Sequence, residues 1–159
     1  MICATNNCFR SGQLLALIWG VFFIGSCTLQ SVFDQHAYER AIELKVKSMA
    51  LMERAKSSSF SSQKEAISGL KTDLEILMEY ESRRKNNEES TRMVWMLKSP
   101  EKGLLGSFLD KWEASRGNMS EYFVDQAKGQ IEEAFNLLIE LESGKIKRSN
   151  ERVQALISK

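Results

Sequence analysis

The sequence has few side chains that could catalyse a reaction or bind a metal ion, and their spacing matches no known catalytic or metal-binding motif. His36 is its one histidine, and it lacks the Glu-x-x-His motif that supplies di-iron helical bundles. A zinc site needs several His, Cys or carboxylate ligands around one ion, and a haem iron bound by His36 would need a second axial ligand such as a methionine. The methionines mostly fall on apolar helical stripes, where methionine is ordinary core filler. We therefore expect no metal and no cofactor.

The sequence also shows no motif for a catalytic nucleophile and no clear pair of residues for acid–base catalysis. The chain has no Gly-x-Ser-x-Gly motif, the sharp turn that exposes the catalytic serine of many hydrolases. Carboxylates such as Glu75 and Glu79 recur among cations at helical spacing, for example Lys71 before Glu75, which is typical of a solvated helix face. The sequence predicts a protein that is not an enzyme.

The segment richest in aromatic and apolar side chains is the best candidate for a binding surface. It includes two of the three tryptophans, and its main members are Trp95, Leu104, Leu105, Phe108, Leu109 and Trp112. Two interpretations stay open. These side chains either cover the core from both halves of a kinked helix, or they form an apolar patch that receives a partner helix or lipid, since such anchors dominate interfaces.

The charge of the chain is balanced. It has 22 Lys and Arg and 21 Asp and Glu, and because Arg10 is the one cation among residues 1–26 and every acid follows it, the rest of the chain is formally neutral. A nucleic-acid partner requires a basic face that neutralises phosphates, so we expect no nucleic acid. The basic stretch over residues 145–159 suits either the negative end of a helix dipole or contact with an anionic membrane surface or cell-wall polymer.

The N-terminal residues have the layout of a secretion signal. Residues 1–13 are mostly polar with one cation, Arg10, and residues 14–24 are an uninterrupted apolar run. This order is typical of a signal peptide. The run is too short to span a bilayer, which takes about 20 apolar residues.

The end of this run resembles the lipobox of bacterial lipoproteins: Ile24, Gly25, Ser26 and Cys27 are a branched aliphatic residue, two small residues and a cysteine. The resemblance covers residues 1–28. It implies that residues 1–26 are a signal peptide that is removed, and that Cys27 carries the lipid as the first residue of the processed chain. Two or three acyl chains give stable anchoring, whereas one gives only marginal anchoring.

Neighbouring residues refine this implication. Cys3 and Cys8 would be lost with the leader, so the processed chain would have no second cysteine for an internal disulfide. Thr28 stands where an Asp would resemble an inner-membrane retention signal, and the resemblance therefore favours the outer membrane over the inner membrane. The partners implied are the membrane, through the lipid anchor, and a protein of unknown identity on the periplasmic side or the cell surface.

After a tether of residues 27–33, helical periodicity predicts a bundle domain over residues 34–159. The first helix should begin at Asp34 and end at the serine cluster 57–59, with small and apolar residues along one face. Ser62 with Glu65 matches a capping box, which predicts the start of the second helix.

Breakers divide the rest of the chain. Ser99-Pro100 indicates a fresh helix start, so the third helix should be kinked there. Asn118 is expected to cap the last long helix and Ser143-Gly144 to end it, which leaves room for a short C-terminal helix over residues 146–157. The predicted fold class is all-α, an antiparallel four-helix-type bundle.

Together these features predict a membrane-anchored lipoprotein that acts as a non-enzymatic binding or accessory module in the cell envelope. One alternative is an inhibitor or immunity-type lipoprotein that neutralises a toxin or lytic enzyme. A further alternative is a helical carrier of a small apolar ligand, which a pocket lined by the third segment would favour.

Overall fold

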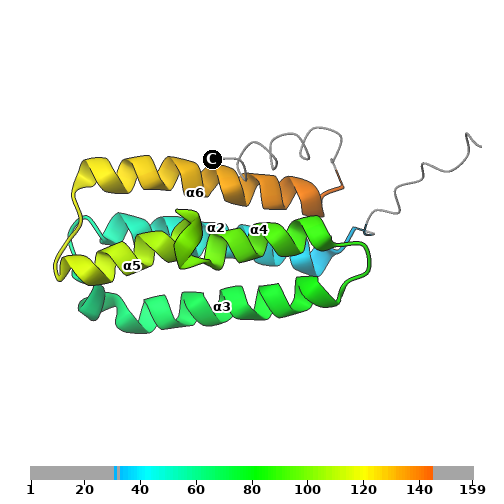
Figure 1. Ribbon diagram of the computed structural model, residues 1–159, viewed down its shortest axis with the longest axis horizontal. Helices are drawn as coiled ribbons and strands as arrows, with labels where there is room; N and C mark the ends of the chain where they lie inside the picture. Colours follow the sequence, from blue (N-terminus) through cyan, green and yellow to red (C-terminus); the bar gives the residue numbers. More distant parts are fainter. Residues whose placement is uncertain (1–30, 32, 145–159) are drawn as a thin grey trace, which may run out of the picture. The chain divides into compact units, whose positions relative to one another are not determined.

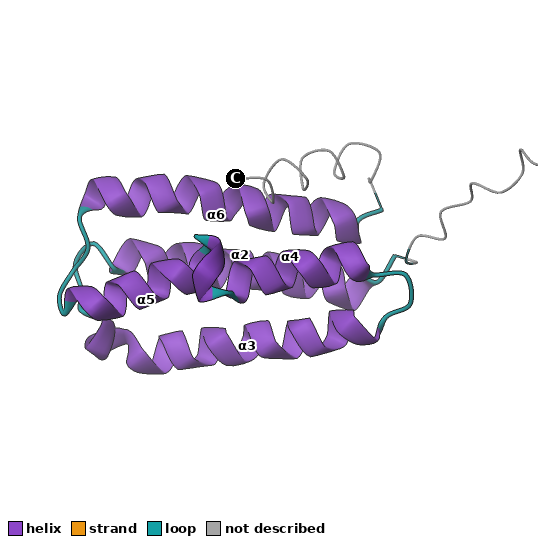
Figure 2. Ribbon diagram, in the orientation of Figure 1, coloured by secondary structure: helices purple, strands orange, loops and turns teal. Residues whose placement is uncertain are grey.

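The computed structural model describes residue 31 and residues 33–144. The predicted signal peptide, the lipobox with Cys27 and the C-terminal helix over 146–157 lie outside these residues. Within them the chain is helical and contains no strand (Figure 1; Figure 2). The helices in chain order are α2 (Gln35–Arg54), the 3-10 helix η1 (Phe60–Gln63), α3 (Lys64–Arg83), α4 (Glu88–Lys98), the 3-10 helix η2 (Pro100–Lys102), α5 (Leu105–Ser115) and α6 (Glu121–Glu142).

Four rods run alongside one another in alternating directions, which confirms the predicted helical bundle (Figure 1). α2 packs against α3 and α6, and α4 packs against the same two helices. α4 and α5 are the two halves of the third rod. The start of α2, the α3–α4 turn and the end of α6 lie at one end of the bundle, which we call the tether end; the α2–α3 and α5–α6 connections lie at the far end (Figure 1).

α2 begins where the sequence predicts. Asp34 is extended, and its carboxylate accepts the backbone N–H of Ala37 at 2.9 Å, which satisfies one of the unpaired donors of the first turn. The buried face follows steps of four and three residues through Ala37, Ala41, Leu44, Ser48 and Leu51, and Met52 lies beside Leu51 on the same face. This face is the seam that packs between α3 and α6.

Two predicted helix caps are wrong. Ser62 does not cap α3: its hydroxyl donates to the carbonyl of Ser59 (2.7 Å), and Ser59 caps the preceding turn η1. Asn118 does not cap α6, because its amide donates to the carbonyl of Lys56 (3.0 Å) while Ser120 caps the helix. Several nearby polar side chains offer equivalent caps, so the pattern alone does not choose among them.

The predicted kink at Ser99-Pro100 is a complete break in the third rod. α4 ends at Lys98, Ser99 caps η2, and Gly103 closes η2 in the left-handed conformation (φ 75°). α5 then passes so close to the end of α4 that a Cβ at Gly106 would lie 2.1 Å from the carbonyl oxygen of Lys98. Gly106 therefore permits this close approach between the two half-helices.

A continuous hydrophobic core joins the rods. Leu74 on α3 and Phe135 on α6 are buried in it. The helices in the described part of the chain are all too short or too polar to cross a membrane.

Candidate functional site

Most of the predicted aromatic patch lies in the core. Five of its six members are 5% exposed or less: Leu104, Leu105, Phe108, Leu109 and Trp112. The interpretation of these five as an exposed partner-binding patch is therefore wrong. The break at η2 gives α5 its own direction, and its apolar face packs into the bundle. Both halves of the third rod thus cover the core.

The aromatic rings of α5 connect it to the far end of the bundle. The indole Nε1 of Trp112 donates to the carbonyl of Ser58 at 3.1 Å, and its ring meets the edge of Phe60 at a centroid distance of 5.8 Å. Phe108 stacks on Phe123 of α6 at 6.1 Å. These ring contacts explain why aromatic residues are concentrated in this segment: they pack α5 against the neighbouring helices.

Trp95 is the one member of the six that stays exposed, with 40% of its surface accessible. It borders a shallow groove of about 330 Å³ between α3 and α4, which is also lined by Met78, Ser82, Arg84, Asn87, Glu88, Thr91 and Arg92. The ammonium of Lys102 lies 5.2 Å from the centre of the Trp95 ring, a cation–π contact. This groove offers an aromatic surface, hydroxyl groups and charged groups of both signs to a ligand.

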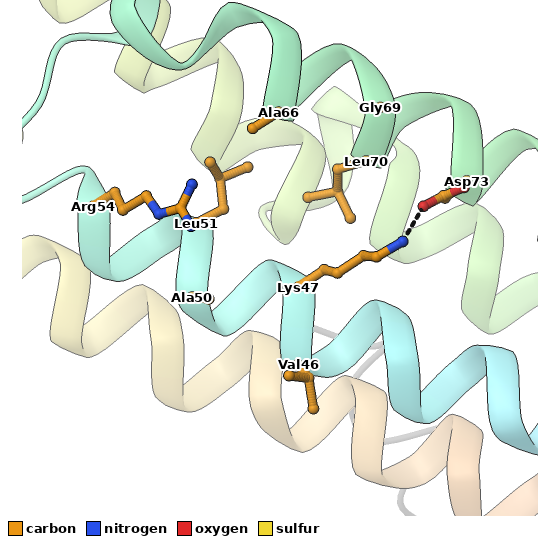
Figure 3. A pocket seen from close by; sticks show the side chains of 9 residues that line it. All are labelled: Val46, Lys47, Ala50, Leu51, Arg54, Ala66, Gly69, Leu70 and Asp73. Atoms are coloured by element: carbon orange, nitrogen blue, oxygen red, sulfur yellow. Dashed lines mark hydrogen bonds and ion pairs between the residues drawn. The ribbon is translucent and has the colours of Figure 1, made fainter.

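A second groove of about 380 Å³ lies between α2 and α3 (Figure 3). Leu51 and Leu70 face into it, and small residues such as Gly69 keep it open. Lys47 reaches from α2 to Asp73 on α3 with an ion pair of 2.8 Å (Figure 3). Arg54, the third charged residue of the lining, donates to the side chain of Gln63 at 3.3 Å.

A buried cluster of charged groups lies inside the tether end. Glu81 of α3 is 0% exposed and Glu142, the last residue of α6, is 2% exposed. Arg84 places one nitrogen, Nη1, 2.7 Å from Oε2 of Glu81 and 2.5 Å from Oε2 of Glu142. The amide of Asn87 donates to the Glu81 carboxylate and to its backbone carbonyl. We call these four residues the carboxylate–arginine cluster.

Among the residues that the structure describes, the two carboxylates of the cluster share one guanidinium, so the charges of these four residues do not balance. Within the described residues, Oε1 of Glu81 and Oε1 of Glu142 accept no hydrogen bond. Burial, followed by the charge of Glu142, raises the pKa of Glu81 above its usual value, against the opposing effects of Asn87 and Arg84. Burial alone would lower the pKa of Arg84, but the hydrogen bond and charge of Glu142 raise it.

The same cluster holds the chain where it enters the bundle. Arg84 donates through Nη2 to the hydroxyl of Ser31 at 3.0 Å, and the N–H of Ser31 donates to the carbonyl of Asn86 at 3.1 Å. Asn86 has a positive φ of 55°, which Asn tolerates better than most residues. Residue 31 is thereby fixed to the α3–α4 turn.

A second link lies one turn further along. The hydroxyl of Tyr80 donates to the Asp34 carboxylate at 2.7 Å. The N–H of Ala37, and then this hydroxyl, lower the pKa of Asp34 despite its partial burial, whereas the bond to Asp34 raises the pKa of Tyr80. His36 is exposed and its ring meets that of Tyr80 at 5.1 Å, so the sole histidine is part of this contact.

No group of three or more His, Cys, Asp and Glu side chains that could hold a metal ion occurs among residues 33–144.

Sequence reasoning missed the cluster, although its pattern carried a signal. Glu81 continues the α3 stripe of Leu70, Leu74 and Leu77 at steps of three and four, and a carboxylate at such a position is buried if the stripe is. Glu142 likewise follows the buried positions of α6. Buried acids of this kind require a cationic or hydrogen-bonding partner, and Arg84, three residues after Glu81, is a candidate in the sequence.

Comparisons of this chain with protein-family models, with curated proteins and with solved structures each found no match.

Proposed function

We propose that the protein is a lipoprotein of the bacterial cell envelope, anchored to the outer membrane in preference to the inner, whose helical bundle serves as a non-enzymatic binding or accessory module. The observation that carries the proposal is the apolar run over residues 14–24 with the sequence Ile24-Gly25-Ser26-Cys27 at its end. The run would direct export, and the thiol of Cys27 would accept the lipid.

The state of the buried acids supports a role without catalysis. A general acid or base must come within hydrogen-bond reach of its substrate. Glu81 and Glu142 are closed off from solvent and contact Arg84, so a substrate has no access to them. Their geometry fits the task of holding helix ends together.

The surface that best fits a protein partner is the groove between α3 and α4 beside Trp95. Tryptophan is enriched among residues that dominate binding energy, and Trp95 is partly exposed with polar groups around it. A partner helix or extended segment that covers the indole would bury apolar surface and meet the hydroxyls of Ser82 and Thr91.

The anchor is tested by the intact mass of the protein extracted from a bacterial envelope. The expected mass is that of residues 27–159 plus acyl chains, and a Cys27→Ala variant should retain its leader and carry no lipid. A wild-type mass without acyl chains would overturn the lipoprotein proposal.

The partner surface is tested by quantitative cross-linking in envelope preparations. Trp95→Ala should lose a specific cross-linked protein that the wild type captures. Tyr122→Ala is the matched control, because Tyr122 is an exposed aromatic residue on α6, and it should keep that protein. A capture pattern unchanged by Trp95→Ala would exclude the groove as the binding surface.

A further inference from the structure

The chain enters the bundle at a fixed place. Ser31 is bound to Asn86 through its N–H and to Arg84 through its hydroxyl, and Asp34 is bound to Tyr80. These bonds hold the first described residues against the α3–α4 turn, at the tether end and away from the far end (Figure 1).

This attachment limits how far the bundle can stand from its anchor. The inference rests on the proposed function, in which Cys27 carries the lipid. Only residues 28–30 then separate the lipidated residue from Ser31, and at about 3.6 Å per residue the two residues are at most about 14 Å apart. The 22 residues of α6 make a rod about 33 Å long. The tether end is thus held beside the lipid, and the far end is a helix length away.

The exposed side chains at the tether end suit a layer of phospholipid head groups. Phe33 is 56% exposed and rests against the ring of Tyr38 at 6.1 Å. Aromatic rings are favourable at the boundary between head groups and acyl chains. Lys85, exposed at the α3–α4 turn, has a long side chain that can reach a lipid phosphate.

Acids also lie at this end. Glu88 and Glu89 lie in the first turn of α4, so the described part of this surface carries charges of both signs. In this proposal the lipid anchor supplies the affinity for the membrane, and the exposed residues determine the orientation of the bundle.

We propose that the tether end of the bundle is its membrane-contacting surface, with Phe33 and Lys85 in the phospholipid head-group layer and the bundle axis standing away from the bilayer. The far end, with the α2–α3 and α5–α6 connections, then points into the aqueous compartment.

The test uses the protein extracted from the envelope and reconstituted in phosphatidylcholine vesicles. Lipidation removes the thiol of Cys27, so an introduced cysteine becomes the single site for a fluorophore. Lys85→Cys reports on the tether end. Lys64→Cys is the matched control, because Lys64 is an exposed lysine at the opposite end of α3. A small fraction of lipid with a head-group nitroxide quenches fluorophores that lie at the membrane surface.

The expected result is an acylated protein with one label, and quenching several-fold stronger for Lys85→Cys than for Lys64→Cys. Acylated protein with equal quenching at both sites, with stronger quenching at residue 64, or with no quenching at either would overturn the orientation and leave the lipoprotein proposal in place. A mass without acyl chains and with a label on Cys27 would overturn both.

Discussion

Replacing Arg84 is the most informative perturbation of the bundle. Its guanidinium lies between two carboxylates, Glu81 and Glu142, that are almost fully buried. Arg84→Met keeps a long side chain but leaves both carboxylates without this cation. Removal of one partner from a buried ion pair costs about 3–5 kcal/mol, because the remaining charge stays buried. We expect a decrease of this size in the free energy of unfolding near neutral pH.

Arg83→Met is the matched control. Arg83 is the preceding residue, but its side chain is 77% exposed and pairs with Glu79 on the helix surface. Loss of an exposed pair should change the free energy of unfolding by less than about 1 kcal/mol, and Arg and Met have similar helix propensities. Urea unfolding followed by circular dichroism, with linear extrapolation, gives both values.

The cost of Arg84→Met should also depend on pH. Protonation of one carboxyl group removes one of the two buried negative charges, so the loss should be smaller at about pH 5 than at about pH 8. Equal losses in Arg84→Met and Arg83→Met would refute the conclusion that the cluster is buried and paired. A large loss that is the same at both pH values would refute the electrostatic reason and leave lost packing as the cause.

Three other outcomes test separate features. Gly106→Ala places a Cβ against the carbonyl of Lys98 and should lower the free energy of unfolding in urea by about 1–3 kcal/mol. The control Gly129→Ala, in open space on α6, should raise it by about 0.5–1 kcal/mol. The reverse order would contradict the close approach between α4 and α5. Phe135→Ala should cost about 3–5 kcal/mol by the same measurement, and a negligible loss would contradict its burial. The pKa of Glu81 is raised in the native state, so its carboxyl group keeps a proton at pH values just above 4.5, where the unfolded chain has lost it. The free energy of unfolding should therefore fall as the pH rises from 4.5 to the native pKa of Glu81. Glu81→Gln should flatten this dependence, and an unaltered pH profile would exclude Glu81 as its source.

The fold was predictable because its determinants are periodic and local. Small and apolar residues at steps of three and four mark the buried faces of α2 and α3, and the single proline, with Ser99 before it, marks the break in the third rod. These signals need no knowledge of which helices meet. The exact caps were less predictable, since Ser59 and Ser62 could each begin a helix.

The candidate sites depend on tertiary geometry and were predicted poorly. The sequence shows that the third segment is apolar, but the direction that α5 takes after η2 decides that Trp112 is buried while Trp95 is exposed. The carboxylate–arginine cluster unites residues from α3, the α3–α4 turn and α6, and it contacts Ser31 at the entry of the chain. Sequence spacing cannot state which stripe positions of different helices face each other.

Burying two carboxylates and one guanidinium costs desolvation free energy, so the carboxylate–arginine cluster needs a role beyond joining helices. Ion clusters of this kind can often be replaced by apolar side chains with no loss, or with a gain of about 1–4 kcal/mol. We therefore expect the triple variant Glu81→Leu, Arg84→Met, Glu142→Leu to recover the stability that Arg84→Met alone loses. It should still remove the hydrogen bond that the Ser31 hydroxyl accepts from Arg84. With that bond lost, the Ser31 amide, which donates to the Asn86 carbonyl, should exchange faster with solvent than in the wild type. Recovery of stability together with faster exchange would mean that the cluster serves to fix the entry of the chain. A triple variant as unstable as Arg84→Met would mean instead that the cluster stabilises the bundle itself.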